Sequence, residues 1–174
     1  MSDDWEAFSP NRFGSGSDAS VELRCAYDSQ NLYVAFKAND DRIVRSKKAR
    51  ANSEDRVSLS LSGGGSKNLS FAVLPGAKRV PRKALRVPSY VELEDSRQER
   101  GFFIELSIPM RKIPGWSPTS PYLAGAIQFH DVDQPSGGKA QSVLGMKGKL
   151  HFSEGAETYK SFMRATGLKN KDVV

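Results

Sequence analysis

Aspartates next to two predicted strands are the residues of this chain best suited to bind a metal ion. Asp131 and Asp133 flank Val132 at the end of one predicted strand, so both carboxylates should point to the same side. Asp40 and Asp41 follow another predicted strand, at 32–38. Ca²⁺ takes about 6–8 oxygen ligands, so these acids would need backbone carbonyls to complete the set. We expect a structural calcium site at Asp40, Asp41, Asp131 and Asp133, and turn capping is the alternative role of these acids.

Two other side chains are suited to contact a ligand. Trp116 lies in the Pro-rich segment 113–118, where a loop aromatic either contacts a ligand or covers the end of a sheet. His130 directly precedes Asp131 at the end of its predicted strand. We expect a ligand to contact Trp116, His130, Asp131 and Asp133, together with nearby Arg and Lys side chains.

No residue pattern typical of an enzyme is present. The chain has neither the G-x-S-x-G turn of serine hydrolases nor the H-E-x-x-H helix of zinc hydrolases. Pairs of carboxylates of the kind glycosidases use occur in any β protein with acidic residues, so they carry no specific signal. We therefore expect no catalytic activity.

The dominant local pattern is alternation of apolar and polar residues with a period of two, which is typical of half-buried strands. Polar or glycine-rich turns join the first four of these runs into two hairpins, and no helical pattern separates the later ones. Strands are predicted at 21–27, 32–38, 57–61, 69–73, 87–93, 102–108, 123–129, 142–146 and 149–152. The pattern predicts an all-β, antiparallel β-sandwich.

One segment near the end of the chain has helical spacing. Tyr159, Phe162 and Met163 lie three or four residues apart, Ser153 is a suitable N-cap and Gly167 a suitable end. We expect a β-sandwich domain over residues 1–152, then a short C-terminal helix and a polar tail over 153–174.

Several segments together resemble one known family. They are D-A-S-V-E-L-R-C-A-Y-D at 18–28, N-L-Y-V-A-F at 31–36, N-D-D-R-I-V at 39–44, E-D-R-V-S-L-S-L at 54–61, G-F-F-I-E-L-S-I-P at 101–109 and F-H-D-V-D at 129–133. In this order they resemble the family 9 carbohydrate-binding modules and their DOMON-like relatives over roughly residues 3–152. The resemblance implies a jelly-roll-like sandwich that serves as a non-catalytic accessory module, often with structural calcium.

The resemblance also implies a sugar clamp of two tryptophans, and here the chain differs. One clamp position falls in residues 51–55, and the other falls in L-G-M-K-G, where Met146 takes the place of the aromatic. We expect Met146 to border the ligand, and Trp5 to be the family's buried tryptophan. Some DOMON-like domains bind haem b between Met and His or Lys, for which this chain offers Met110, Met146 and His130.

The net charge of +6 favours an anionic partner. The basic runs at 42–50 and 78–86 carry no interleaved aromatics, so nucleic acid is not expected. No apolar run is long enough to span a membrane, and the chain begins without a signal peptide. We expect a carbohydrate-binding module for an anionic cell-envelope polysaccharide, acting outside the cytoplasm as part of a longer protein. The alternatives are a protein-interaction domain that has lost the clamp and, third, a haem b electron-transfer domain.

Overall fold

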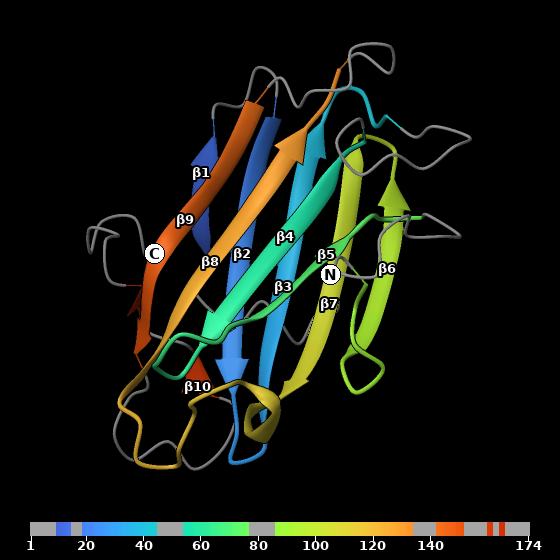
Figure 1. Ribbon diagram of the computed structural model, residues 1–174. Helices are drawn as coiled ribbons and strands as arrows, with labels where there is room; N and C mark the ends of the chain where they lie inside the picture. Colours follow the sequence, from blue (N-terminus) through green and yellow to red (C-terminus); the bar gives the residue numbers. More distant parts are fainter. Residues whose placement is uncertain are drawn as a thin grey trace.

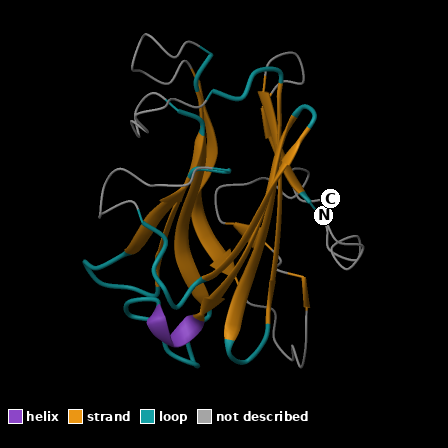
Figure 2. Cartoon of the chain, turned by 90° about the vertical axis from the view of Figure 1, so that its right-hand side faces the viewer, coloured by secondary structure: helices purple, strands orange, loops and turns teal. Residues whose placement is uncertain are grey.

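Two antiparallel β-sheets face each other and form the domain, as the views in Figure 1 and Figure 2 show. The structure is a computed structural model that describes residues 10–14, 19–44, 54–76, 86–133, 142–151, 160–161 and 164–165. One sheet has the strand order β1-β2-β3-β7-β6 with β10 also paired to β2, and the other has the order β11-β9-β8-β4-β5. The strands are β1 (Asn11–Gly14), β2 (Ala19–Tyr27), β3 (Asn31–Asp40), β4 (Arg56–Ser62), β5 (Leu69–Val73), β6 (Glu92–Gln98), β7 (Gly101–Pro109), β8 (Tyr122–Asp131), β9 (Ser142–His151), β10 (Lys160–Ser161) and β11 (Arg164–Ala165).

The sequence prediction of an all-β antiparallel sandwich is confirmed. Both predicted hairpins are present, because β2 pairs with β3 and β4 pairs with β5 in antiparallel register. The β2–β3 turn is closed by Asp28, whose Oδ1 accepts hydrogen bonds from the backbone N–H groups of Gln30 and Asn31, both at 2.7 Å. Such a turn fixes the register locally, so the apolar residues of both strands face the same side.

Two predicted strands near the middle and end of the chain have different bounds. β6 begins at Glu92 rather than at Val87, because Pro88 opens a turn in which the N–H of Val91 donates to the carbonyl of Pro88 at 2.9 Å. The two strands predicted at 142–146 and 149–152 are one strand, β9. Its glycines interrupt the apolar pattern but not the backbone pairing with β8.

The prediction of a C-terminal helix is wrong for the described residues of that segment, which form strands. Lys160–Ser161 form β10, which pairs with β2, and Arg164–Ala165 form β11, which pairs with β9. A helix of about 12 residues is marginal by itself in water, whereas both sheet edges offer backbone groups for pairing. No helix in the described part of the chain has the length and apolar character that a membrane span requires.

The core lies between the sheets and is built from the inward-facing residues of each strand. Its largest group is an aromatic cluster in which Phe102 and Phe129 pack edge-to-face with centroids 5.4 Å apart, and Phe36 contacts both. Each of these phenylalanines is at most 1% exposed. Cys25 is buried in the same core, and burial raises the pKa of its thiol to about 12, so the thiol is unreactive at neutral pH.

Candidate functional site

Three buried aspartates meet at one end of the sandwich. Asp40 ends β3 and Asp131 ends β8, and each lies two residues after an inward-facing core residue. Asp55 lies directly before β4, two residues before the core residue Val57. One carboxylate oxygen from each lies within 4.8 Å of the others. Since β3 belongs to one sheet and β4 and β8 belong to the other, the packing of the two sheets brings these carboxylates together.

Backbone N–H groups from the surrounding loops hold these carboxylates in place. Asp55 accepts from the N–H of Val132 at 2.8 Å and also from the N–H of Val44. Asp40 Oδ1 accepts from the N–H of Arg42 at 2.8 Å. The carboxylate of Asp55 thus joins the loop that follows β3 to the residue that follows β8.

The donor set of this aspartate cluster, Asp40, Asp55 and Asp131, fits a hard cation such as Ca²⁺. All three are at most 3% exposed. Ionised carboxylates that are buried this close together repel one another strongly. Buried oxygens Asp40 Oδ2 and Asp131 Oδ1 accept no hydrogen bond, although both residues make other interactions. Oxygen ligands in this arrangement suit Ca²⁺ better than a softer metal ion.

The structure brings together only two of the four aspartates that the sequence predicts for a metal site. Asp40 and Asp131 lie in the cluster, whereas Asp41 is exposed and Asp133 is half-buried, and neither lies in it. β8 ends at Asp131, so the alternation that would have put Asp133 on the same side stops there. The sequence analysis missed Asp55, although it lies two residues before Val57 on the inward-facing side of β4.

His130 lies next to the aspartate cluster in sequence but faces away from it. It is paired in register with Arg56 across β4 and β8, and Arg56 Nη2 lies 3.1 Å from His130 Nδ1. Burial, together with the positive charge of Arg56, lowers the pKa of His130 to about 4. His130 is therefore neutral at pH 7, and its Nδ1 can accept a hydrogen bond from Arg56.

Trp116 is separated from the other predicted ligand residues. The N–H of Gly63, just beyond the end of β4, donates to the carbonyl of Pro114, and Trp116 lies in this same loop. His130 pairs with Arg56 at the start of β4. The six residue steps of β4 span about 20 Å, so one small ligand does not contact both Trp116 and His130.

Met110, one of the two methionines that the sequence offers for a haem site, lies far from His130. Met110, in the 3-10 turn η3 (Met110–Lys112), is 3% exposed and packs in the core at the same end as Trp116. The N–H of Met110 donates to the carbonyl of Gln30 in the β2–β3 turn. Met110 and His130 thus lie at opposite ends of the sandwich. The side chains of Met146 and Trp5 lie outside what the structure describes.

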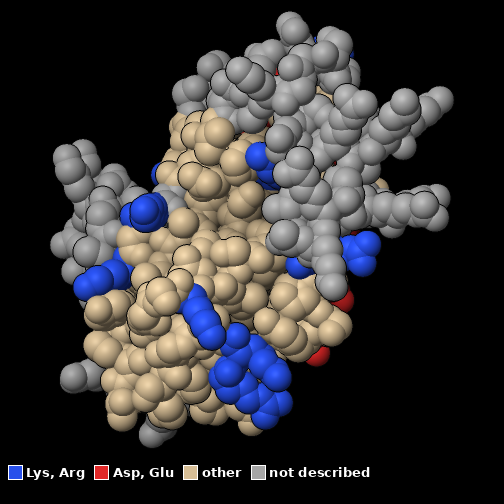
Figure 3. Space-filling model, viewed as in Figure 1, with Lys and Arg blue, Asp and Glu red and all other residues tan. Residues whose placement is uncertain are grey.

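The outer face of the β5-β4-β8-β9 sheet is a second surface with a distinct composition. Its described outward-facing residues carry Arg56, Lys147 and Lys149 but no Asp or Glu. They are Arg56, Ser58, Ser60, Ser62, Ser70, Ala72, Tyr122, Ala124, Ala126, Gln128, His130, Val143, Gly145, Lys147 and Lys149. Figure 3 shows this face with basic side chains in several places, and the acidic side chains in view lie at its right-hand edge.

A shallow trough runs across this outer face. Its volume is about 310 Å³, and it is lined by Ser60, Ser62, Asn68, Ala124, Gly125, Ala126, Lys147, Gly148 and Lys149. The small side chains of β4 and β8 form its floor, and the two lysines of β9 form one wall. Lys149 Nζ lies 4.0 Å from the centre of the Tyr122 ring, which holds the ammonium group at the surface by a cation–π contact. The alternation of Ser58, Ser60 and Ser62 with apolar residues was the sequence signal for this floor.

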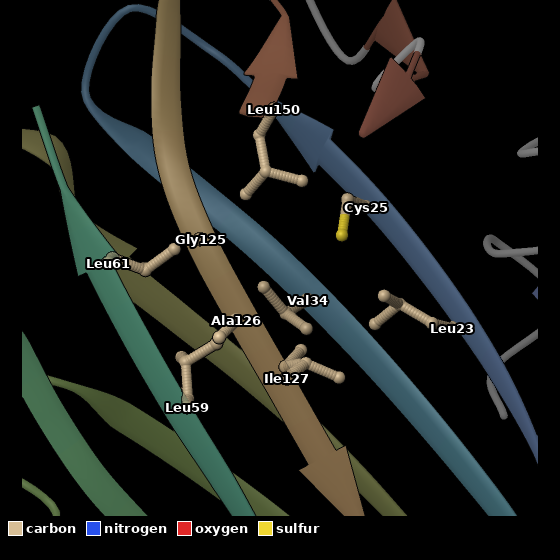
Figure 4. Close-up of a pocket in the computed structure, with 9 residues that line it drawn as sticks. All are labelled: Leu23, Cys25, Val34, Leu59, Leu61, Gly125, Ala126, Ile127 and Leu150. Atoms are coloured by element: carbon tan, nitrogen blue, oxygen red, sulfur yellow. The ribbon is translucent and has the colours of Figure 1, made fainter. Parts of the chain in front are cut away.

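The gap between the sheets that the described residues line offers no room for a sugar. Figure 4 shows an apolar gap lined by residues of both sheets, among them Cys25, Val34 and Ile127. Its volume is about 20 Å³, which is close to the space that one water molecule needs. Within the part of the chain that the structure describes, we therefore place a sugar on an outer surface of the sandwich.

Comparison with known proteins identifies the fold. No model of a protein family matches the chain, and no curated protein sequence matches it. A solved family 9 carbohydrate-binding module from Caldicellulosiruptor kristjanssonii, in complex with cellotriose, matches with a TM-score of 0.64 and 14% identity over 90% of this chain and 80% of the module. A structure of such a module in complex with glucose, from the same organism, matches with a TM-score of 0.62 and 14% identity over 92% of this chain and 86% of the other. The fold that the sequence resemblance implied is confirmed.

Proposed function

We propose that this domain is a non-catalytic carbohydrate-binding module that binds an anionic polysaccharide in the trough on its outer face. The observation that carries the proposal is the composition of this face, where the described side chains include three bases and no acid. The fold supports the proposal, because the family 9 modules that share it have been solved with cellotriose and glucose. In this proposal the domain acts outside the cytoplasm, where cell-envelope polysaccharides occur.

The chemistry of the trough suits a charged sugar chain. The hydroxyl group of Ser60 and the amide of Asn68 can exchange hydrogen bonds with sugar hydroxyls. The hydroxyl of Ser62 is instead used within the β4–β5 turn, where it donates to the carbonyl of Lys67 at 3.0 Å and accepts from the N–H of Gly64 at 3.1 Å. Lys147 and Lys149 project from the same side of β9 two residues apart, so both ammonium groups can approach carboxylates or sulfates along one chain. The trough's lining includes no aromatic ring, so charge rather than stacking should provide most of the affinity.

We also propose that the aspartate cluster holds a structural Ca²⁺ ion. Asp40, Asp55 and Asp131 would supply carboxylate oxygens, and the ion would neutralise the charge that these three residues bring together. Its role would be to fix the loop after β3, the residues before β4 and the end of β8 relative to one another. These elements position Arg56 and His130 at one end of the outer face.

Titration calorimetry with acidic and neutral polysaccharides tests the carbohydrate proposal. Wild-type protein should bind a uronic-acid polysaccharide, and the affinity should fall as salt is raised, because mobile ions screen exposed charges. Lys147→Gln should weaken binding about tenfold, which corresponds to about 1.4 kcal/mol.

The matched control is Lys37→Gln, which removes an exposed lysine from β3 in the other sheet. The control should leave the affinity unchanged. An equal loss of affinity in both variants would show that only the net charge of the protein matters. Tighter binding of the neutral polysaccharide would contradict the assignment of an anionic ligand. A domain that serves only to dock a protein partner would bind none of the polysaccharides.

A further inference from the structure

A second pocket, beside Trp116, lies at the β2–β3 turn. Its volume is about 310 Å³, and it is lined by Ser29, Gln30, Asn31, Pro109, Arg111 and Trp116. This volume is at the lower end of the range for small-molecule pockets, which suits a ligand the size of one or two sugar units. None of the residues that line the outer-face trough lines this pocket.

The loop that carries Trp116 is held against the β4–β5 turn by close backbone contact. The N–H of Gly63 donates to the carbonyl of Pro114 at 2.8 Å, and the N–H of Trp116 donates to the carbonyl of Ile113 at 3.2 Å. A Cβ added at Gly63 would lie 2.2 Å from the backbone nitrogen of Trp116, so only glycine allows this approach. These contacts set the backbone position of Trp116 before any ligand arrives.

Trp116 presents an apolar ring to the pocket while the rest of the side chain is supported. It is half-buried and packs against the hydrophobic core, yet it also lines the pocket. An indole held in this way offers a flat apolar surface, and the C–H groups of a sugar ring pack well on such a surface. Little conformational entropy is lost on binding, because the ring is already ordered.

The opposite wall of the pocket is also rigid. Asp28 accepts hydrogen bonds from the N–H groups of Gln30 and Asn31 and, at 2.8 Å, from the hydroxyl of Tyr33. Burial acts to raise the pKa of Asp28, but these hydrogen bonds outweigh burial and lower it. The carboxylate of Asp28 is thus used within the turn and does not line the pocket, whereas Ser29, Gln30 and Asn31 do.

Arg111 gives the pocket its charge. Its side chain is exposed, and it forms no ion pair within the part of the chain that the structure describes. A guanidinium group binds a carboxylate through two parallel hydrogen bonds, which favours this anion over a neutral hydroxyl group. An aromatic ring, hydroxyl and amide groups and an available arginine are together the groups that a uronate sugar requires.

We infer that the Trp116 pocket is a second carbohydrate subsite, selective for a sugar unit that carries a carboxylate. The sugar ring packs on Trp116, its carboxylate pairs with Arg111, and its hydroxyl groups meet Ser29, Gln30 and Asn31. This inference rests on the proposed function, since it assumes that the domain binds an anionic glycan, but it assigns a separate site on the far side of the β4–β5 turn from the trough.

Nuclear magnetic resonance of the tryptophan side chains in the full chain tests this inference. The protein has 2 tryptophans, so it gives two indole N–H signals, and Trp116→Phe identifies the one that belongs to Trp116. Titration with trigalacturonate should shift this signal. The methyl-esterified trisaccharide, which lacks the charges, should bind at least tenfold more weakly.

Two variants separate the Trp116 pocket from the trough. Arg111→Gln should weaken the trigalacturonate titration of the Trp116 signal at least tenfold, and Lys147→Gln should leave it unchanged. A Trp116 signal that does not move, that responds equally to the methyl ester, or that is insensitive to Arg111→Gln overturns the inference. If calorimetry then still shows binding that depends on Lys147, the proposed function stands alone, and if no uronic-acid glycan binds by either method, both are overturned.

Discussion

Replacing Asp131 with asparagine should affect the stability of the domain differently in the presence and absence of calcium. Oxygens of Asp40, Asp55 and Asp131 lie within 4.8 Å of one another. Two unit charges 4.8 Å apart repel by about 3.5 kcal/mol when the effective dielectric constant is about 20. Asp131 takes part in two of the three pairs, so Asp131→Asn removes about 7 kcal/mol of repulsion from a fully ionised cluster without a cation.

This repulsion is large compared with the stability of a typical domain, which is about 5–15 kcal/mol. Proton uptake by one carboxylate already relieves part of the repulsion. The increase in the free energy of unfolding caused by Asp131→Asn without calcium should therefore be smaller than the repulsion calculated for a fully ionised cluster. A bound Ca²⁺ ion relieves the repulsion in the wild type. At a calcium concentration of 100 times its dissociation constant, the ion should raise the free energy of unfolding by about 2.7 kcal/mol.

Thermal unfolding in EDTA and in excess calcium measures both effects. Calcium should raise the Tm of the wild type by about 5–11 °C, given a shift of about 2–4 °C per kcal/mol for a domain of this size. Asp131→Asn should unfold at or above the wild-type Tm in EDTA and should gain little from calcium. Asp41→Asn is the matched control, because Asp41 is exposed and lies outside the cluster, and it should behave like the wild type.

One result would refute this reasoning. If EDTA leaves the wild-type Tm unchanged and Asp131→Asn lowers the Tm equally in both conditions, the three carboxylates serve only as hydrogen-bond acceptors for the backbone. Protonation of a carboxylate, rather than a bound cation, would then relieve the repulsion among the three side chains.

Three further predictions concern the core and the β2–β3 turn. Phe129→Ala should lower the free energy of unfolding in urea by about 3–5 kcal/mol, because it leaves a cavity in the aromatic cluster. Cys25 should not react with a thiol reagent at pH 8 until the protein is unfolded, and fast reaction of the native protein would contradict its burial and its pKa of about 12. Asp28→Asn should be less stable than the wild type at pH 7. Because the folded pKa of Asp28 is lowered, this difference should shrink as the pH falls from the ordinary Asp value of about 3.9 through the folded pKa, and a pH-independent difference would rule out this linkage.

The sequence alone was sufficient to predict the strands and the hairpins. Alternation is a local property, so Val34 and Phe36 could be assigned to the inward side of β3 without knowing which strand lies opposite. The β2–β3 turn was equally local, because Asp28 closes it through bonds to residues two and three positions ahead. Physical rules with such a short range need no tertiary information.

The same local pattern was not sufficient to predict where a strand ends. Asp133 was grouped with Asp131 by spacing, but β8 stops at Asp131 and the two residues differ in burial. The helical spacing near residue 160 was likewise a weak signal, because a short helix is marginal by itself while β2 and β9 offer backbone partners.

The sites themselves were decided by the tertiary structure. Asp40 ends a strand of one sheet, whereas Asp131 and Asp55 lie at the end of one strand and directly before another in the second sheet, so only the packing of one sheet on the other brings their oxygens together. Trp116 and His130 are near each other in sequence, yet β8 carries the chain from one end of the sandwich to the other between them. The sequence determined which residues face inward and outward along each strand, whereas the pairing and stacking of distant strands determined which of those residues meet, because these contacts depend on long-range register.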